Sequence, residues 1–337
     1  MNVVRMLMVG VGGMGQEHIQ QLLGLNDVRI VGLVDPSSAA IAATHHRFPS
    51  LAEVPSFDSC GEALSAVQAD AAVIVSPHSY HLEHGLVCLD AGLHVLMEKP
   101  FVAGSANAQQ LIARAEANKL HLAVSYQRHL EGPYMYLRDL VQSGALGRIL
   151  VVSAYQAQGW LRGTAGSWRQ DPAISCGGQL NDSGSHLLDV VLWITGLQPL
   201  EVSATIDNRD TQVDIDSAVT VRLEGGALAT FVVAGSALGS EAHDVWEDIS
   251  IHGDNGTALY RVGTLLVARD GSRNLVEVPT DQMRPDSDPD RDFVDLIQGR
   301  VTQAAAPASC GLAVARLTEA AWQSAQLGRT VTLTQPV

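Results

Sequence analysis

Two side chains that could exchange a proton lie four residues apart in a glycine-rich stretch in the second half of the chain. Asp182 and His186 are expected to share one face at the start of a helix. A carboxylate beside an imidazole sets the tautomer of the ring and raises its basicity, as a general base requires. Ser183 and Ser185 lie nearby, but no G-x-S-x-G turn surrounds either serine, which disfavours a Ser/His/Asp hydrolase.

A lysine follows a predicted strand in the first half of the chain. The apolar run from His94 to Met97 predicts a strand that delivers Glu98, Lys99 and Pro100 at its carboxyl end. Ligands of open α/β sheets bind beside the carboxyl ends of the strands, and the proline makes the chain leave the strand there. Lys99 is therefore a second candidate for proton chemistry, with a surface lysine in a turn as the alternative.

A glycine-rich turn near the N-terminus indicates a dinucleotide site. An unbroken apolar run precedes Gly10, Gly12 and Gly15, which form a G-x-G-x-x-G pattern. In this pattern Gly10 permits a tight turn, Gly12 lets the backbone approach a pyrophosphate, and Gly15 lets the next helix pack closely. The predicted strand from Val28 to Val34 ends at Asp35, where an acidic residue meets the ribose hydroxyls of NAD.

The elements that must position these residues predict two domains. Residues 1–124 are expected to form a dinucleotide-binding Rossmann domain, an α/β fold with a doubly wound parallel sheet. Residues 125–337 are expected to form an α+β domain for substrate binding and oligomerisation, with a large, open, mostly antiparallel sheet. An exposed sheet face of this size is typical of an oligomer interface, so we expect a homodimer or homotetramer.

Composition and patterning narrow the functional class. The hydrophobic content of 46% and charged content of 17% are typical of a globular protein with a substantial core. No apolar run reaches about eighteen residues, so we expect no membrane span. We also expect no signal peptide, because the apolar N-terminus lacks a cleavage-site pattern. The net charge of −15 disfavours a nucleic-acid partner. Four cysteines without a C-x-x-C pattern fit reduced thiols in a cytoplasm.

Three histidines between two predicted elements raise the question of a metal. His78, His81 and His84 are spaced by three residues, which places neighbours on adjacent helical positions. No fourth ligand lies at a convincing spacing. We therefore expect no metal site and interpret this segment as a loop and helix start at the carboxyl edge of the sheet.

Several motifs together resemble the Gfo/Idh/MocA family of NAD(P)-dependent oxidoreductases. They are the N-terminal glycine pattern with Asp35, the Ser76-Pro77…His81 segment, the run Ala91-Gly-Leu-His-Val-Leu-Met-Glu-Lys-Pro100, and the G-G-x-x-x-D-x-G-x-H-x-x-D run from Gly177 to Asp189. The Glu-Lys-Pro that follows Ala-Gly-x-His-Val is specific to the family, whereas the glycine pattern is not. The resemblance covers essentially the whole chain.

The resemblance implies which residues contact cofactor and substrate. Contacts to NAD are implied for Gly10, Gly12, Gly13, Met14, Gly15, Asp35, Ser76, Pro77, His81, Glu98, Lys99, Trp168 and Arg169. Contacts to substrate are implied for Lys99, Arg128, His129, Asp182 and His186. At the position of His129 the family commonly carries a second basic residue.

The implied reaction is oxidation of a secondary hydroxyl of a sugar, polyol or sugar derivative, with hydride transfer to C4 of the nicotinamide. His186 is the candidate base, Lys99 would hydrogen-bond the same hydroxyl, and Asp182 would orient His186 or hold a neighbouring hydroxyl. We expect NAD because Asp35 would repel the 2′-phosphate of NADP, although serines nearby leave NADP binding open. Two alternatives remain: an NAD-dependent glycosidase that oxidises its sugar transiently, and a non-catalytic NAD(P)-binding sensor.

Overall fold

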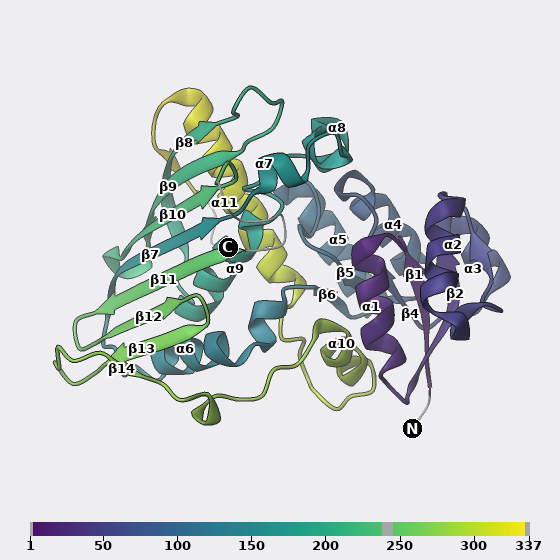
Figure 1. Cartoon of the computed structure of the whole chain (residues 1–337), viewed down its shortest axis with the longest axis horizontal. Helices are drawn as coiled ribbons and strands as arrows, with labels where there is room; N and C mark the ends of the chain where they lie inside the picture. The colour runs from purple at the N-terminus through teal and green to yellow at the C-terminus, as the bar shows by residue number, and fades with distance from the viewer. Residues whose placement is uncertain (1–2, 238–244, 334–337) are drawn as a thin grey trace. The chain divides into compact units, whose positions relative to one another are not determined.

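The computed structural model describes residues 3–237 and 245–333 and divides the chain into two compact units. Unit 1 contains Met1–Gln127 and Ser287–Leu312, and unit 2 contains Arg128–Asp286 and Ala313–Val337. Figure 1 follows the elements of both units along the chain. The chain thus returns to unit 1 late in the sequence. The expected division into residues 1–124 and 125–337 has a single boundary and does not include this return.

Unit 1 is built on a six-stranded sheet in the order β3-β2-β1-β4-β5-β6, in which all paired strands are parallel. This is the doubly wound Rossmann topology that the sequence predicts, with the strand order reversing between β1 and β4. Every residue of β4 is buried, as in a parallel sheet covered on both faces. The strands are β1 Val4–Val9, β2 Val28–Val34, β3 Ser56–Phe57, β4 Ala71–Ile74, β5 His94–Met97 and β6 Leu122–Val124.

Helices connect these strands, and one of them comes from the late return of the chain. They are α1 Gly13–Leu23, α2 Ser38–Arg47, η1 Pro49–Leu51, α3 Cys60–Ala66, η2 His78–Tyr80, α4 His81–Asp90, α5 Ser105–Asn118 and α10 Pro289–Ile297. The acidic run from Asp286 to Asp292 predicts a polar loop, and that prediction is wrong for its second half. Helix α10 begins there, with Asp288 as its N-cap, and packs Phe293 and Val294 into the core beside α1.

Unit 2 is built on a nine-stranded sheet in the order β14-β13-β12-β11-β7-β10-β9-β8-β15. Only the β7–β10 pair among these described strands is parallel, so the prediction of a mostly antiparallel sheet is confirmed. The strands are β7 Ile149–Ala157, β8 Pro199–Asp207, β9 Asp216–Leu223, β10 Leu228–Ala234, β11 Trp246–Gly253, β12 Thr257–Arg261, β13 Thr264–Ala268, β14 Val276–Glu277 and β15 Val331–Thr332.

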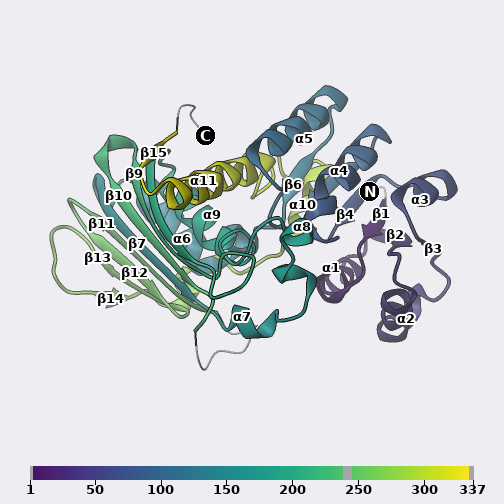
Figure 2. The ribbon, with the colours of Figure 1, turned by 90° about the horizontal axis from the view of Figure 1, so that it is seen from above.

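The long helices that belong wholly or mostly to unit 2 cover one face of this sheet (Figure 2). Figure 2 shows α6, α9 and α11 along that face, while the described residues place no helix on the other. The stretch from Gly159 to Gly178 is expected to be irregular, but it contains three short helices. The helices are η3 Gln127–Leu130, α6 Gly132–Gln142, α7 Trp160–Gly163, η4 Trp168–Gln170, α8 Pro172–Ser175, α9 Gly184–Thr195, η5 Glu224–Gly226, η6 Thr280–Gln282 and α11 Ala308–Leu327. Among the described residues, no helix is both long and apolar enough to cross a membrane.

Candidate active site

The candidate residues of unit 1 gather at one edge of its sheet. Gly10 follows β1, Asp35 follows β2, Ser76 lies two residues after β4, and Lys99 lies two residues after β5. Because these strands are parallel, their carboxyl ends meet at the same edge. That edge is where open α/β sheets bind ligands. The topology therefore brings together four positions that lie far apart in the sequence.

Close backbone packing shapes the turn between β1 and α1. Gly10 has a φ of +89°, and a Cβ there would lie 2.7 Å from the carbonyl oxygen of Val75. A Cβ at Gly15 would lie 2.2 Å from the carbonyl oxygen of Gly10. These two positions accept only glycine without a shift of the backbone, because both obstructing atoms belong to the main chain.

The same turn leaves open space at the start of α1. Ideal Cβ atoms at Gly12 and Gly13 have no heavy atom within 4 Å, and no side chain caps the helix. The next side chain, Met14, is 46% exposed. A helix start with open space and uncapped N–H groups fits the pyrophosphate of a dinucleotide.

The Asp35 carboxylate is held at the end of β2 by two main-chain donors. Its Oδ2 accepts from Val11 N at 3.0 Å, and its Oδ1 accepts from Ser37 N at 2.9 Å. Each carboxylate oxygen keeps one more lone pair. The half-buried carboxylate can therefore accept hydrogen bonds from ribose hydroxyls without losing its own supports.

The His81 ring ties together the loops that follow β4 and β5. It is fully buried, with Nε2 2.8 Å from the carbonyl oxygen of Ser76 and Nδ1 2.9 Å from that of Pro100. Burial lowers the pKa of His81, although the carbonyl oxygens oppose this effect. His84 places Nδ1 2.9 Å from Ser76 Oγ. Pro77 occupies the N-cap position of the short helix η2, which lies between Ser76 and His81 in the chain. The resemblance implies a cofactor contact for His81, and the structure shows its ring nitrogens held by carbonyl oxygens of the two loops.

Glu98 lies against the main chain of Lys99. Its Oε2 accepts from Lys99 N at 3.1 Å, and its Oε1 lies 3.2 Å from Nε2 of His18 on α1. The carboxylate is buried, whereas Lys99 is half-buried. Glu98, another expected cofactor contact, thus supports the strand end from which Lys99 projects.

In unit 2, a buried carboxylate organises the glycine-rich loop ahead of α9. Asp214 accepts from Gly178 N at 2.9 Å, from Leu180 N at 2.6 Å and from Trp322 Nε1 at 3.0 Å. A Cβ at Gly178 would lie 1.9 Å from the carbonyl oxygen of Asp214, and one at Gly177 would lie 2.6 Å from the Trp322 ring. Burial raises the pKa of Asp214, and the three donors oppose that rise.

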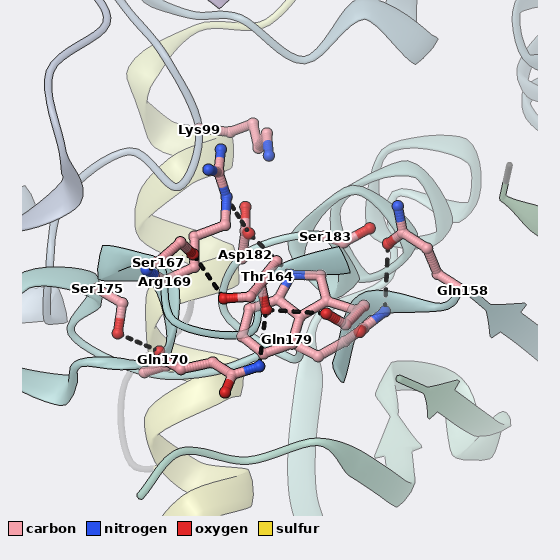
Figure 3. A network of polar contacts seen from close by, with 12 residues as sticks. Lys99, Gln158, Thr164, Ser167, Arg169, Gln170, Ser175, Gln179, Asp182 and Ser183 are labelled. Atoms are coloured by element: carbon pink, nitrogen blue, oxygen red, sulfur yellow. Dashed lines mark hydrogen bonds and ion pairs between the residues drawn. The ribbon is translucent and has the colours of Figure 1, made fainter. Parts of the chain in front are cut away.

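Asp182 accepts two hydrogen bonds from the segment between Trp160 and Arg169, which also carries Trp168. Its Oδ2 lies 3.0 Å from Trp160 Nε1 and 3.1 Å from Arg169 Nε. Figure 3 shows the Arg169 side chain directed at this carboxylate. The Arg169 guanidinium also lies 4.5 Å above the Trp168 ring. Two predicted cofactor contacts are thereby linked to a predicted catalytic carboxylate within one unit.

His186 lies in the first turn of α9 and is buried. Helix α9 begins at Gly184, so Asp182 precedes the helix and lies in the turn before it. The expectation that Asp182 and His186 share a helical face is therefore wrong, because α9 begins two residues after Asp182. In the turn between them, Ser183 Oγ accepts from Gln156 Nε2 at 2.7 Å.

Arg128 and His129, the expected substrate contacts at the start of unit 2, lie in buried carboxylate pairs. Arg128 makes a bidentate pair with Glu247, with distances of 3.1 Å for Nε–Oε1 and 2.6 Å for Nη2–Oε2. His129 Nε2 lies 2.8 Å from Asp189 Oδ2, and the ring stacks on Trp193. Both side chains connect segments of unit 2.

Sequence reasoning missed the buried partners of the motif residues. Asp214, Glu247 and Trp322 lie outside every motif, and their side chains meet the motifs only after folding. The adjacent glycines at 177 and 178 indicate that another part of the chain packs closely against this loop, but the sequence does not identify that part. His18, three residues after Gly15, is close to a motif but received no role.

Comparisons with known proteins give the family. A model described as "Oxidoreductase family, NAD-binding Rossmann fold" matches residues 4–126, and one described as "GFO/IDH/MocA C-terminal domain" matches residues 134–259. The rhizopine catabolism protein MocA of Rhizobium meliloti is 28% identical over 200 residues, 58% of both chains. Inositol 2-dehydrogenase of Corynebacterium glutamicum is 27% identical over 201 residues, 59% of this chain and 56% of that one.

The matches thus span under two thirds of these relatives' lengths. A structure of levoglucosan dehydrogenase with NADH and levoglucosan has the same fold over 99% of this chain and 100% of that one, with a TM-score of 0.85 at 18% identity. The resemblance noted from the motifs is confirmed, and so is the NAD-binding Rossmann domain. The chain belongs to the Gfo/Idh/MocA family of oxidoreductases.

Proposed function

We propose that the chain catalyses the NAD-dependent oxidation of a secondary hydroxyl on a sugar, polyol or sugar derivative. The observation that carries this proposal is the single sheet edge at which a glycine turn, a ribose-type carboxylate and a half-buried lysine follow parallel strands. The relatives named inositol 2-dehydrogenase and levoglucosan dehydrogenase support a polyhydroxylated substrate.

Unit 1 would hold the cofactor. The open start of α1 at Gly12, Gly13 and Met14 would receive the pyrophosphate, with Gly10 and Gly15 shaping the turn. Asp35 would accept from the ribose, which favours NAD over NADP. We propose further contacts from Ser76, Pro77, Lys99, Trp168 and Arg169, and supporting roles beneath them for His81 and Glu98.

Unit 2 would supply the substrate site and the base. When bound, the nicotinamide accepts the hydride that leaves the substrate carbon. His186 would take the hydroxyl proton, and Lys99 would donate a hydrogen bond to the same oxygen as negative charge develops on it. Asp182 would hold a neighbouring hydroxyl, because Trp160 and Arg169 fix its carboxylate. Arg128 and His129 would shape the substrate site through their buried pairs.

The test is a panel of polyols, aldoses and anhydrosugars incubated with the protein and NAD. Accumulation of NADH with a sugar or polyol supports the dehydrogenase. Release of an aglycone without net NADH would identify a glycosidase instead, and NAD binding without either product would identify a sensor. The two alternatives are outcomes of this test, since no feature of residues 3–237 and 245–333 favours them.

The open face of the sheet would make the chain a homodimer or homotetramer. Exposed apolar side chains on that face pair across β7 and β10, Val151 with Leu228 and Tyr155 with Val232. Buried against a second copy, these side chains would leave water. Light scattering should then give an oligomer that Val232→Glu dissociates; a monomeric parent protein would refute this assembly. Four free cysteines fit a cytoplasmic protein.

A further inference from the structure

A histidine of unit 1 lies between two buried carboxylates. His18 Nδ1 is 2.8 Å from Asp290 Oδ2, and its Nε2 is 3.2 Å from Glu98 Oε1. The ring and both carboxylates are nearly inaccessible to solvent, with Asp290 at 0% exposure. The three residues come from different elements: α1, the end of β5, and α10, which belongs to the late return of the chain.

A charged ring would satisfy both contacts of His18. A neutral imidazole carries one N–H and can donate to only one of the two carboxylates, whereas an imidazolium donates to both. Burial alone would lower the pKa of His18, but the charges and hydrogen bonds of Asp290 and Glu98 outweigh it and raise the pKa to about 10. Burial raises the pKa of Asp290, and the charge and hydrogen bond of His18 oppose that rise. At neutral pH the charged ring therefore lies between two carboxyl groups and attracts both.

The charged ring acts on Lys99 through Glu98. Burial would raise the pKa of Glu98, but its hydrogen bond to His18 and the positive charge of that ring lower it. The carboxylate thus stays ionised, and its second oxygen accepts from Lys99 N at 3.1 Å. One oxygen of Glu98 faces the cation while the other fixes the main chain at the position where the lysine side chain begins.

We propose that His18 is a positioning residue for the reaction: as an imidazolium anchored by Asp290, it holds Glu98 against the main chain of Lys99. The chain Asp290–His18–Glu98–Lys99 then connects α10 and the helix of the glycine turn to the candidate proton-handling lysine. This inference rests on the proposed function in one respect, because the proposed function makes Lys99 a reacting group. It also assigns a role in the site to the segment that rejoins unit 1 at Ser287, because that segment carries Asp290.

The composition of the chain offers a direct probe of Lys99. The sequence contains only two lysines, Lys99 and the exposed Lys119. In a Lys119→Arg background, reductive methylation with 13C-formaldehyde leaves the Lys99 signal and that of the N-terminal amine. The 13C spectrum then reports the surroundings of Lys99 without any turnover. The 15N spectrum of the histidine rings reports the protonation of His18 in the same protein.

The experiment compares His18→Gln, Asp290→Asn and the control His46→Gln, which changes an exposed histidine on α2. We expect both ring nitrogens of His18 protonated at pH 8, and both network variants to shift the Lys99 signal. In unmethylated protein we expect kcat to fall by about 10²-fold while the NAD dissociation constant stays within about threefold, since a small misplacement of a reacting group costs that much. The control should change none of these.

A neutral His18 ring at pH 8 would overturn the proposal, whatever the activity. So would network variants that lower the melting temperature but leave both the Lys99 signal and kcat unchanged, because that pattern describes a purely structural pair. Asp290→Asn keeps the side-chain volume, so it can test the network if the His18→Gln variant does not fold. If the parent protein oxidises no sugar, the proposed function fails, yet the ring protonation and the Lys99 signal still decide the positioning role.

Discussion

The two units hold their candidate residues by different means. In unit 1 the residues follow the ends of parallel strands, and the close main-chain packing of Gly10 and Gly15 shapes the turn beside them. In unit 2 buried carboxylates fix the segments around His186, with Asp214 and Asp182 accepting from distant side chains and amides. We therefore expect added volume at Gly10 or Gly15 to damage unit 1 and the loss of a buried charge to damage unit 2, although the buried His18–Asp290 pair makes unit 1 depend on charge as well.

The largest effect should come from removing one proton-handling group in each unit. We expect Lys99→Ala and His186→Ala each to lower kcat by about 10²–10⁴-fold, the usual contribution of a positioned acid or base. NAD binding, followed by fluorescence titration, should persist in both variants. Steady-state kinetics with the best substrate from the sugar panel measures the effect. Lys119→Ala provides the control because that lysine is exposed at the end of α5.

If only one of the two variants loses activity, the proposal that both units supply reacting groups is wrong. An unchanged kcat in Lys99→Ala would leave unit 1 as a cofactor holder only. An unchanged kcat in His186→Ala would move the base elsewhere in the chain.

The charge dependence of unit 2 can be tested at the buried Arg128–Glu247 pair. Its side chains are 9% and 5% exposed, whereas those of the Arg222–Glu201 pair in the same unit are 53% and 44% exposed. Removing one partner of a buried pair typically costs about 3–5 kcal/mol, because the other charge is left without compensation. We expect Arg128→Met to lower the free energy of unfolding by that amount in urea titrations.

Two variants sharpen this comparison. Arg222→Met should cost at most about 1 kcal/mol, since water screens an exposed pair. Arg128→Met combined with Glu247→Leu should regain part of the lost stability, because no unpaired charge remains. A double variant that is less stable than Arg128→Met alone would contradict the view that the orphaned Glu247 charge carries the cost.

The volume dependence of unit 1 can be tested with two alanine substitutions in one helix turn. Gly15→Ala would place a Cβ against the Gly10 carbonyl oxygen, so we expect a loss of about 1–3 kcal/mol in unfolding free energy. Gly13→Ala enters open space, so we expect unchanged or slightly higher stability together with weaker NAD binding. Thermal unfolding and NAD titration measure the two effects. Equal losses of stability would show that the open space at Gly13 does not exist.

The features that the sequence predicts are those that depend on local patterns. The parallel sheet, its order of motifs and the edge that carries Gly10, Asp35 and Lys99 follow from local patterns and from the rule that parallel strands align their ends. The mostly antiparallel sheet of unit 2 follows from alternation along its strands. These features depend on residues near one another in the chain.

The rest depends on partners that no local pattern contains. Asp214 approaches Gly178 from 36 positions away, and Asp290 reaches His18 from 272 positions away. The acidic run around Asp290 resembles a solvated loop because burial of a carboxylate needs a cation that the local sequence does not show. The resemblance implies substrate contacts for Arg128 and His129, but no motif predicts that Arg128 pairs with Glu247 or that His129 pairs with Asp189, the last residue of the glycine-rich motif.

The smallest expected effect concerns the choice of cofactor at Asp35, where unit 1 combines charge with its main-chain scaffold. We expect the parent protein to bind NAD more tightly than NADP, and Asp35→Asn to narrow that ratio by about tenfold as the repulsion of the 2′-phosphate is removed. Asparagine offers one acceptor oxygen where the carboxylate serves both Val11 N and Ser37 N, so a modest loss of stability should accompany the change. Titration of both cofactors measures the ratio, with Asp58→Asn, an exposed change after β3, as the control. Tighter binding of NADP by the parent protein would mean that main-chain donors around Asp35 outweigh its charge, and unit 1 would then select its cofactor by shape alone.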